Sequence, residues 1–214
     1  MKRKILFLLI VILCFILGIR AQVPYGLNSY IAPNTATIFL DFDGHTTTDP
    51  FWTAFTNNQP FVCGPDTSLT NAQKIRVFNL VAEDYRPFTI NVTTDSAVYL
   101  ATPLTKRTRV VITQTWQWYG NAGGVAYLES WRWGNAGWGT IPCFVFSSLL
   151  KGDDKDIAEA ISHEAGHTLG LYHQSRWRYP DTDTCKFSDE YHPGTGTLYT
   201  ETSWAPIKIG RAHV

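Results

Sequence analysis

The chain has 214 residues, 44% of them hydrophobic, which is enough to bury the core of one ordinary domain or two small ones. It contains 18 basic and 18 acidic residues. Four of the basic residues lie in the N-terminal segment described next, so the rest of the chain has 14 basic and 18 acidic residues. This neutral to mildly acidic balance gives no support for nucleic-acid binding, and we expect no nucleic-acid partner.

Residues 1–21 are predicted to be a secretory signal peptide. They comprise the basic start MKRK, an apolar run from Ile5 to Ile19, and the small residue Ala21 at a possible cleavage site. A membrane anchor is the alternative, but the run is short for a span of about 20 residues and no comparable run follows. We therefore expect a secreted protein, extracellular or periplasmic, without stable membrane association after cleavage.

The next elements alternate between strand and helix. Residues 36–42 (ATIFLDF) predict a strand. Thr70 and Gln73 form a capping box that starts a helix, which ends before Pro87. Its predicted buried face comprises Ile75, Phe78, Ala82 and Tyr85. Further strands are predicted at residues 88–93, 109–113, 123–128 and 142–147, the last apolar enough to be buried on both faces.

A second long helix is predicted to begin at Asp153, where a carboxylate is favoured by the helix dipole. Ile157, Ala158 and Ile161 supply its buried face, and Gly170 supplies a left-handed exit. The predicted order is one strand, a helix, four strands and a second helix. This order predicts a mixed α/β (α+β) fold class.

The end of this helix carries the stretch HEAGHTLGLYH, residues 163–173. His163 and His167 are four residues apart, so both rings project from one helical face, with Glu164 beside them. A bend at Gly170 would return the chain and bring His173 to the same point. Three imidazoles, one carboxylate and an open position suit a catalytic zinc ion. The alternative is a buried helix whose histidines are hydrogen-bonded in the core.

This stretch is similar to the metzincin pattern HExxHxxGxxH at every fixed position. The chain also resembles secreted bacterial metzincin-type peptidases through LDFDGHT (40–46), VAEDYRPF (81–88), NVTT (91–94), AGGVAYL (122–128) and WAPI (204–207). The resemblance implies a metzincin-like zincin fold, with a mixed, mostly parallel twisted sheet and two main helices. It also implies a zinc endopeptidase with one catalytic Zn²⁺, in which His163, His167 and His173 are the ligands and Glu164 is the general base.

The resemblance further implies how the substrate binds. Residues Gly123, Gly124, Val125, Ala126 and Tyr127 resemble the edge strand on which metzincins lay an extended protein or peptide substrate. An ordinary structural edge is the alternative for this strand. A monomer is expected. For the whole chain, a zinc amidase and a non-enzymatic zinc-containing binding module are the competing functions, and the presence of Glu164 argues against the second.

The resemblance divides the chain after the signal peptide into a catalytic domain, residues 22–214, with an N-terminal subdomain at about 36–172 and a partial C-terminal subdomain at about 173–207. Metzincins carry a methionine turn after the third histidine, whereas Met1 is the sole methionine here. The ending KIGRAHV, residues 208–214, matches a translated sequencing adapter. We therefore predict an artefactually truncated gene product with a foreign tail and little activity; a genuine short variant is the alternative.

Several other polar residues have two interpretations each. Asp41, Asp43 and Asp49 follow the first strand and could bind Ca²⁺, although carboxylates there are more often turn and cap residues. His45 and His192 fit no ligand pattern and are expected at the surface or in turns.

Three cysteines remain after signal cleavage. Cys143 lies in an apolar run and is predicted to be a buried free thiol, which leaves Cys63 and Cys185 as the predicted bridge. The tryptophan-rich segment, which is interrupted by Gly and Asn, is predicted to form loops whose rings pack against the domain.

Overall fold

The computed structural model describes residues 26–32, 35–173, 176–178 and 186–189. The predicted signal peptide, Cys185, His192 and the predicted tail at 208–214 lie outside the described residues.

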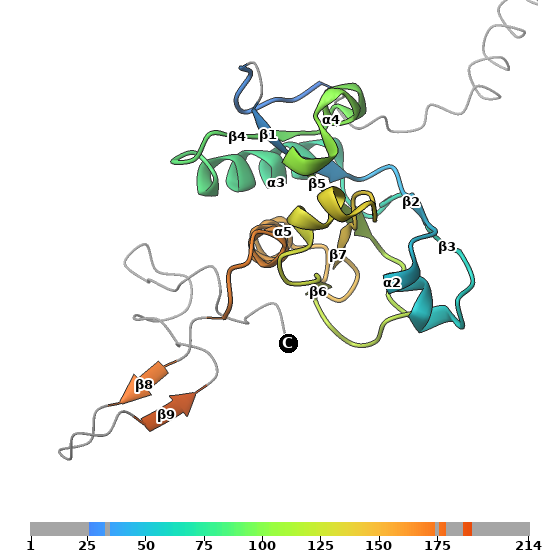
Figure 1. The fold of residues 1–214 in the computed structure, drawn as a ribbon. Coiled ribbons are helices and arrows are strands. Elements are labelled where there is room, and N and C mark those ends of the chain that lie inside the picture. Colours follow the sequence, from blue (N-terminus) through green and yellow to red (C-terminus); the bar gives the residue numbers. More distant parts are fainter. Residues whose placement is uncertain (1–25, 33–34, 174–175, 179–185, 190–214) are drawn as a thin grey trace, which may run out of the picture.

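The described elements follow one another as short strands and helices (Figure 1). The strands are β1 Ala36–Asp41, β2 His45–Thr47, β3 Phe61–Cys63, β4 Ile90–Thr93, β5 Arg107–Thr113, β6 Gly124–Val125, β7 Cys143–Phe146, β8 Arg176–Arg178 and β9 Lys186–Asp189. The α-helices are α2 Pro50–Thr53, α3 Asn71–Asp84, α4 Ser96–Ala101 and α5 Asp154–Thr168, and the 3₁₀ helices are η1 Ala54–Thr56, η2 Leu104–Lys106 and η3 Ser130–Ala136.

Five of these strands form one sheet in the order β4-β1-β5-β7-β6. The first four are parallel, and β6 pairs antiparallel with β7. The predicted α/β class with a mostly parallel sheet is therefore confirmed. The sequence pattern missed the β2–β3 pair and the short helices, because three- to seven-residue elements show too few periods to be recognised.

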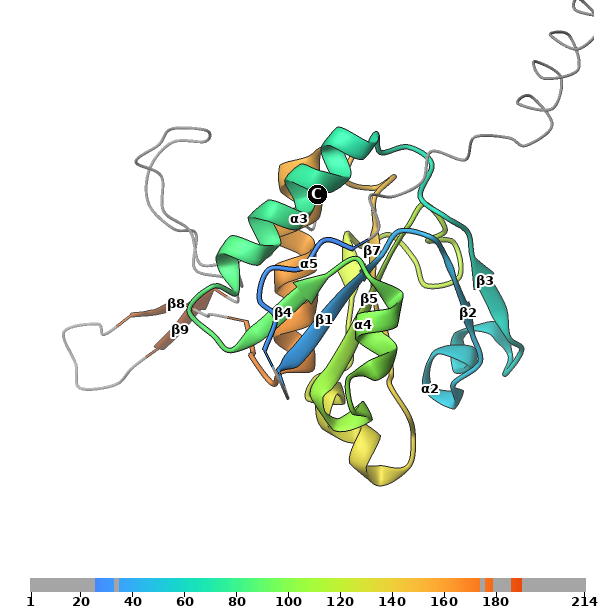
Figure 2. The ribbon, with the colours of Figure 1, turned by 90° about the horizontal axis from the view of Figure 1, so that it is seen from above.

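The two long helices, α3 and α5, lie next to each other on one side of the sheet, with α2, β2 and β3 on the other (Figure 2). Alternate residues of β5 and β7 serve the two faces. Val110 and Val145 pack with the helices, while Val111 and Phe144 join an aromatic cluster around Trp52. Burial on both faces explains why β7 has the sequence of a continuous apolar run.

Helix α3 begins as predicted, with a complete capping box between Thr70 and Gln73. Its predicted buried face is partly wrong. Phe78 is buried, but Ile75 is 38% exposed, and Val77 and Val81 are fully buried instead. Ile75 has the spacing expected of the apolar face of α3, yet it lies at the border of the face that packs against the sheet and α5.

The aromatic cluster on the other face fills the space under α2. Trp52 is 1% exposed and donates its indole N–H to the Pro142 carbonyl oxygen at 2.8 Å. Rings of the tryptophan-rich segment, such as that of Trp118, pack against it as predicted. Cys143 and Cys63 are both buried, and neither forms a disulfide with another described cysteine. The predicted bridge of Cys63 is to Cys185, which lies outside the described residues.

The two edges of the sheet differ. Residues 27–30 cover the outer edge of β4: the Ser29 amide donates to the Val92 carbonyl oxygen and the Thr94 amide to the Leu27 carbonyl oxygen, both at 3.0 Å. β6 forms the other edge and is two residues long, shorter than the predicted 123–128, because the Tyr127 carbonyl already accepts the Ser130 amide at the start of η3.

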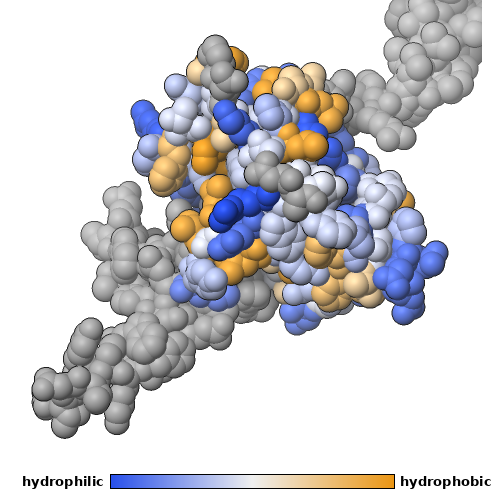
Figure 3. All heavy atoms as spheres, in the orientation of Figure 1, coloured by the Kyte–Doolittle hydropathy of each residue, from blue (hydrophilic) through white to orange (hydrophobic). Residues whose placement is uncertain are grey.

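The surface drawn in Figure 3 mixes hydrophilic and hydrophobic residues. Among the described residues, no helix combines the length and the apolar character needed to span a bilayer.

A pair of isoleucine substitutions tests this packing. Ile157, on α5, is fully buried in the main core, whereas Ile75 is partly exposed. We expect Ile157→Ala to lower the free energy of unfolding by about 2–5 kcal/mol through lost burial and a residual cavity. Ile75→Ala should cost less than about 1 kcal/mol. Denaturant unfolding measures both, and equal losses would contradict the orientation of α3.

Candidate metal centre

Helix α5 carries His163 and His167, and its N-terminus is capped. The Asp153 side chain caps the helix by accepting the backbone amides of Lys155 and Asp156 at 2.9 and 3.0 Å. The predicted buried face of Ile157, Ala158 and Ile161 is confirmed. One turn from the C-terminus, His163 is buried and His167 is half-buried, both on the same side of the helix.

The helix ends in a Schellman motif centred on Gly170. The Gly170 amide donates to the His167 carbonyl oxygen and the Leu171 amide to the Gly166 carbonyl oxygen, each at 2.9 Å. Gly170 has φ +92°, a left-handed value that is strained for any residue with a side chain. The predicted bend is therefore present, and it carries His173 back alongside the helix.

The bend brings the three imidazoles together. The Nε2 atoms of His163 and His167 lie 3.0 Å apart, those of His167 and His173 3.0 Å, and those of His163 and His173 3.2 Å. Nitrogen ligands at about 2.0–2.1 Å from a tetrahedral zinc ion are separated by about 3.3 Å, close to these values. Three Nε2 atoms in one triangle cannot all be satisfied by hydrogen bonds to one another, so the arrangement fits ligands around one cation.

The hydrogen bonding of His167 prepares its ring for this role. Its Nδ1 lies 2.7 Å from the Leu171 carbonyl oxygen. A carbonyl can only accept, so Nδ1 carries a proton, and in the neutral ring the Nε2 lone pair is directed at the other two rings. Of the groups of three or more His, Cys, Asp or Glu side chains within the described residues, this trio alone could hold a metal ion.

Glu164 is held beside the trio by the edge strand. Its side chain is 3% exposed. A Cβ added to Gly124 in β6 would lie 2.7 Å from Glu164 Cγ and 2.9 Å from the Phe144 carbonyl oxygen. Position 124 therefore accepts glycine alone without displacing either the carboxylate side chain or strand β7.

The five predicted substrate-binding residues lie along this edge. Gly123 and Gly124 are buried and bonded into the sheet, since the Gly123 carbonyl accepts the Phe146 amide at 2.9 Å and Gly124 pairs with Val145. Val125, Ala126 and Tyr127 are half-buried, and the Tyr127 hydroxyl donates to the Phe51 carbonyl oxygen at 3.2 Å.

A neighbour that the sequence did not indicate is Glu129. Its backbone amide donates to the His167 carbonyl oxygen at 2.9 Å, and its Cγ would lie 3.3 Å from a Cβ at position 170. Glu129 has φ +60°, which is uncommon for a residue with a long side chain. No pattern in the sequence marks this contact; it links the segment after β6 to the end of α5.

Two of the three carboxylates proposed for calcium have other partners. Asp41 forms an ion pair with Arg109 at 2.9 Å, and Asp49 caps α2 by accepting the amides of Phe51 and Trp52. The structure does not bring Asp41, Asp43 and Asp49 within reach of one ion.

His45 is likewise not a free surface residue. It lies in β2, half-buried, with its Nδ1 2.7 Å from Arg109 Nη1. Because Arg109 can only donate, that nitrogen is an acceptor and the ring is neutral. Burial, and then the charge of Arg109, lower the pKa of His45 to about 4.

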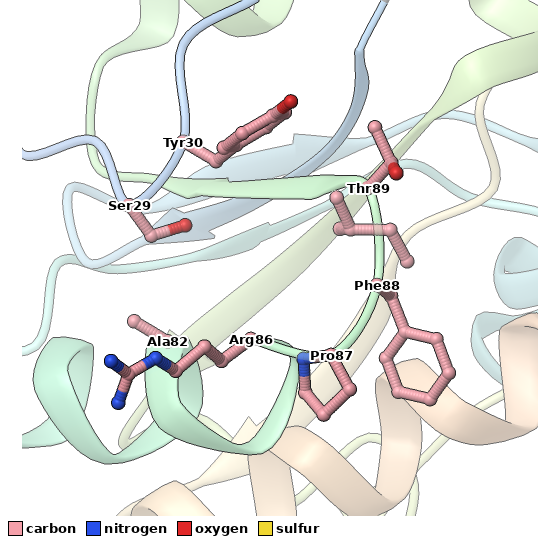
Figure 4. Close-up of a pocket in the computed structure, with 8 residues that line it drawn as sticks. Ser29, Tyr30, Ala82, Arg86, Pro87, Phe88 and Thr89 are labelled. Atoms are coloured by element: carbon pink, nitrogen blue, oxygen red, sulfur yellow. The ribbon is translucent and has the colours of Figure 1, made fainter.

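A surface pocket of about 390 Å³ lies at the opposite edge of the sheet, beside β4 (Figure 4). Figure 4 shows Ser29 on one side of it and Ala82, Arg86 and Pro87 on the other. None of its lining residues is a histidine, cysteine or carboxylate, so it offers neither metal ligands nor a general base.

The sequence matches none of the protein-family models with which it was compared, and no curated protein matches it. The candidate metal centre therefore rests on its own geometry.

Zinc binding tests the centre directly. We expect the protein to bind one Zn²⁺ per chain, and His167→Ala to weaken binding by at least about 100-fold, because one of three ligands is lost. His45→Asn is the matched control and should leave the affinity unchanged. Calorimetric titration after chelator treatment measures both, and unchanged zinc affinity in His167→Ala would contradict the site.

Acid unfolding tests the environment of His45. Since its pKa is lowered to about 4, the folded state binds fewer protons than the unfolded state between about pH 4 and 6.5. The stability from neutral His45 is thus complete above about pH 6.5 and is lost as the pH falls toward 4.

We therefore expect the stability advantage of the wild type over His45→Asn to shrink by on the order of 1–2 kcal/mol between pH 7.5 and 4.5, allowing for partial exposure. Denaturant unfolding in the presence of EDTA measures the difference at each pH. Burial raises the pKa of Asp41 to about 6, so Asp41 changes the stability in the opposite direction as the pH falls. Both proteins contain Asp41, so this contribution is common to them. A pH-independent difference between the two would show that His45 is not buried in this way.

Proposed function

We propose that this chain is a secreted zinc endopeptidase of the metzincin type. The observation that carries the proposal is the convergence of three Nε2 atoms within 3.0–3.2 Å of one another, next to the buried carboxylate of Glu164. A structural zinc site has four protein ligands, whereas three histidines leave a position for water or substrate. Export is inferred from the N-terminal sequence pattern.

The fold supports this assignment at a coarser level. A mostly parallel sheet with α3 and α5 on one side and a short antiparallel edge strand is compatible with the N-terminal subdomain of a metzincin. The proposal places the catalytic histidines at the end of α5, directly behind that edge strand.

In the proposed reaction, His163, His167 and His173 would hold a zinc ion, which would lower the pKa of water toward about 7 and polarise the scissile carbonyl. Glu164 accepts the proton of the attacking water and then delivers it to the departing amine. Its position against Gly124 restricts the rotamers open to the carboxylate, so the proposed base would need little movement before substrate arrives.

The substrate is proposed to be an extended protein or peptide segment that adds to the free edge of β6. One edge of β6 is bonded to β7, and no described strand pairs with the other. Main-chain hydrogen bonds to this edge would align the peptide without requiring a particular sequence. Gly123–Tyr127 would supply them.

Loss of the general base tests the proposed reaction. In the full native gene product, we expect Glu164→Gln to reduce cleavage of unfolded casein by about 10²- to 10⁴-fold, because proton transfer from water is lost, while zinc still binds one to one. Glu159→Gln is the matched control: Glu159 lies on the same helix, with its side chain 48% exposed and 3.4 Å from Lys155, and its loss should leave cleavage unchanged.

The alternatives give different results in the same assay. Zinc binding without any Glu164-dependent cleavage of protein would reject the peptidase and favour a binding module. Glu164-dependent hydrolysis of small amides without cleavage of casein would favour an amidase.

A further inference from the structure

The pocket beside β4 lies where the N-terminal segment that covers this edge leaves the sheet. The Ser29 amide donates to the Val92 carbonyl oxygen at 3.0 Å. The next amide, that of Tyr30, turns away from the strand main chain and donates to the Asn91 side chain at 3.1 Å. The end of α3 lies opposite, and the space between has a volume of about 390 Å³, which is the size of a small-ligand pocket.

The main chain of Ile90 faces this pocket. Along a strand, successive peptide groups point to opposite edges. The amides of Val92 and Thr94 both donate to the covering segment, so Ile90, two residues before Val92, points its N–H and C=O to the same outer edge. No described residue is bonded to these two groups of Ile90. The pocket therefore contains one unpaired position of the sheet edge.

One end of the pocket offers hydrogen-bond donors. Ser29 Oγ accepts the Val92 amide at 2.8 Å, which fixes the hydroxyl and leaves its hydrogen to donate to a ligand. Figure 4 shows the side chain of Arg86 running back along α3, with its guanidinium at the same end of the pocket as Ser29 but on the other side. Of the described residues that line the pocket, Arg86 alone is charged. This end therefore suits an anion.

The ion pair of Arg86 with Glu83 leaves the guanidinium able to bind a ligand. Its Nη1 lies 3.3 and 3.2 Å from the two carboxylate oxygens of Glu83, and the two side chains are 74% and 69% exposed. Exposed pairs of this kind are weak. No described residue accepts a hydrogen bond from Nε or Nη2, so these nitrogens remain for a second carboxylate.

The rest of the pocket is largely apolar. Its apolar surface comes from four residues, Ala82, Pro87, Phe88 and Ile90. Figure 4 shows Pro87 and Phe88 toward the end away from the Arg86 guanidinium. The pocket thus joins a cationic, donor-bearing end to an apolar remainder, which is complementary to a ligand with one negative group and a small apolar body.

We propose that this pocket binds a small monocarboxylate, with the carboxylate on Arg86 and Ser29 and the apolar body against Ala82 and Pro87. A planar carboxylate matches the fork of a guanidinium, which can donate two parallel hydrogen bonds to it. The carboxylate belongs either to a free carboxylic acid or to the carboxy-terminal residue of a peptide. The site lies at the opposite edge of the sheet from the histidines and does not depend on the proposed function.

The first test uses 3-phenylpropionate as the probe in an NMR titration of the isotope-labelled protein. We expect a dissociation constant on the order of 1 mM, as for a ligand of this size, with the largest shifts at the amides of Ser29, Arg86 and Ile90. The neutral 3-phenylpropionamide has the same shape and should bind at least about 10-fold more weakly. Equal binding of the acid and the amide would overturn the proposal, as would shifts confined to other residues.

Variants on α3 test the role of the guanidinium. We expect Arg86→Gln to weaken binding of 3-phenylpropionate by at least about 10-fold at an unchanged melting temperature, because the substitution removes an exposed charge. Arg76→Gln is the matched control: Arg76 is also exposed on α3 and ion-paired, with Asp154, but does not line the pocket. Glu83→Gln should tighten binding by about two- to fivefold, since the competing carboxylate is removed. Unchanged affinity in Arg86→Gln, or an equal loss in Arg76→Gln, would contradict the proposal.

A second probe distinguishes the two sources of the carboxylate. N-acetylphenylalanine is 3-phenylpropionate with an added acetamido group, whose N–H can pair with the carbonyl of Ile90 as a peptide would. Tighter binding of N-acetylphenylalanine supports a site for peptide carboxy termini, and tighter binding of 3-phenylpropionate supports a site for a free acid. Absence of shifts with both probes at about 10 mM, ten times the expected dissociation constant, would reject the carboxylate site.

Discussion

The left-handed turn at Gly170 is the constraint on which the candidate site depends. A helix can bring two of the three histidines together by its own geometry, but His173 is six residues beyond His167 and would lie on another face if α5 continued. Two hydrogen bonds of the Schellman motif close the turn. An L-residue in the left-handed region costs roughly 1–2 kcal/mol, and here a side chain would also press on Glu129.

The same turn is joined to the edge strand. The His167 carbonyl accepts amides from both Gly170 and Glu129, so the end of α5 and the segment after β6 share one acceptor. Within β6 itself, Gly124 packs against the side chain of Glu164. Glu164, His167 and the proposed substrate strand are thus positioned against one another, so the proposed site would need little reorganisation before it could act.

The sequence predicted those parts of the structure that depend on local geometry. The capping box of Thr70 and Gln73, the Asp153 cap, the bend at Gly170 and the juxtaposition of the three histidines all follow from spacing within one element or one turn. These features depend on residues that are close in the chain, where the angles of a helix leave few alternatives.

What the sequence missed depends on contacts between distant residues. The pairing of Arg109 with Asp41 and His45 spans 68 and 64 positions, and nothing near His45 indicates that it is buried. The prediction that Ile75 is buried was wrong. Helical spacing shows which residues share a face of α3, but it does not show exactly which face meets the sheet.

The unequal edges of the sheet have a consequence for self-association. A strand edge with unpaired amides is a template for aggregation as well as for ligands, and proteins usually shorten, charge or cover such edges. Here the β4 edge is covered by residues 27–30, and the β6 edge is two residues long before the chain turns into η3. An edge of that length can hold a short extended peptide for a time, but it offers a second copy of the sheet too few hydrogen bonds to propagate a continuous ribbon.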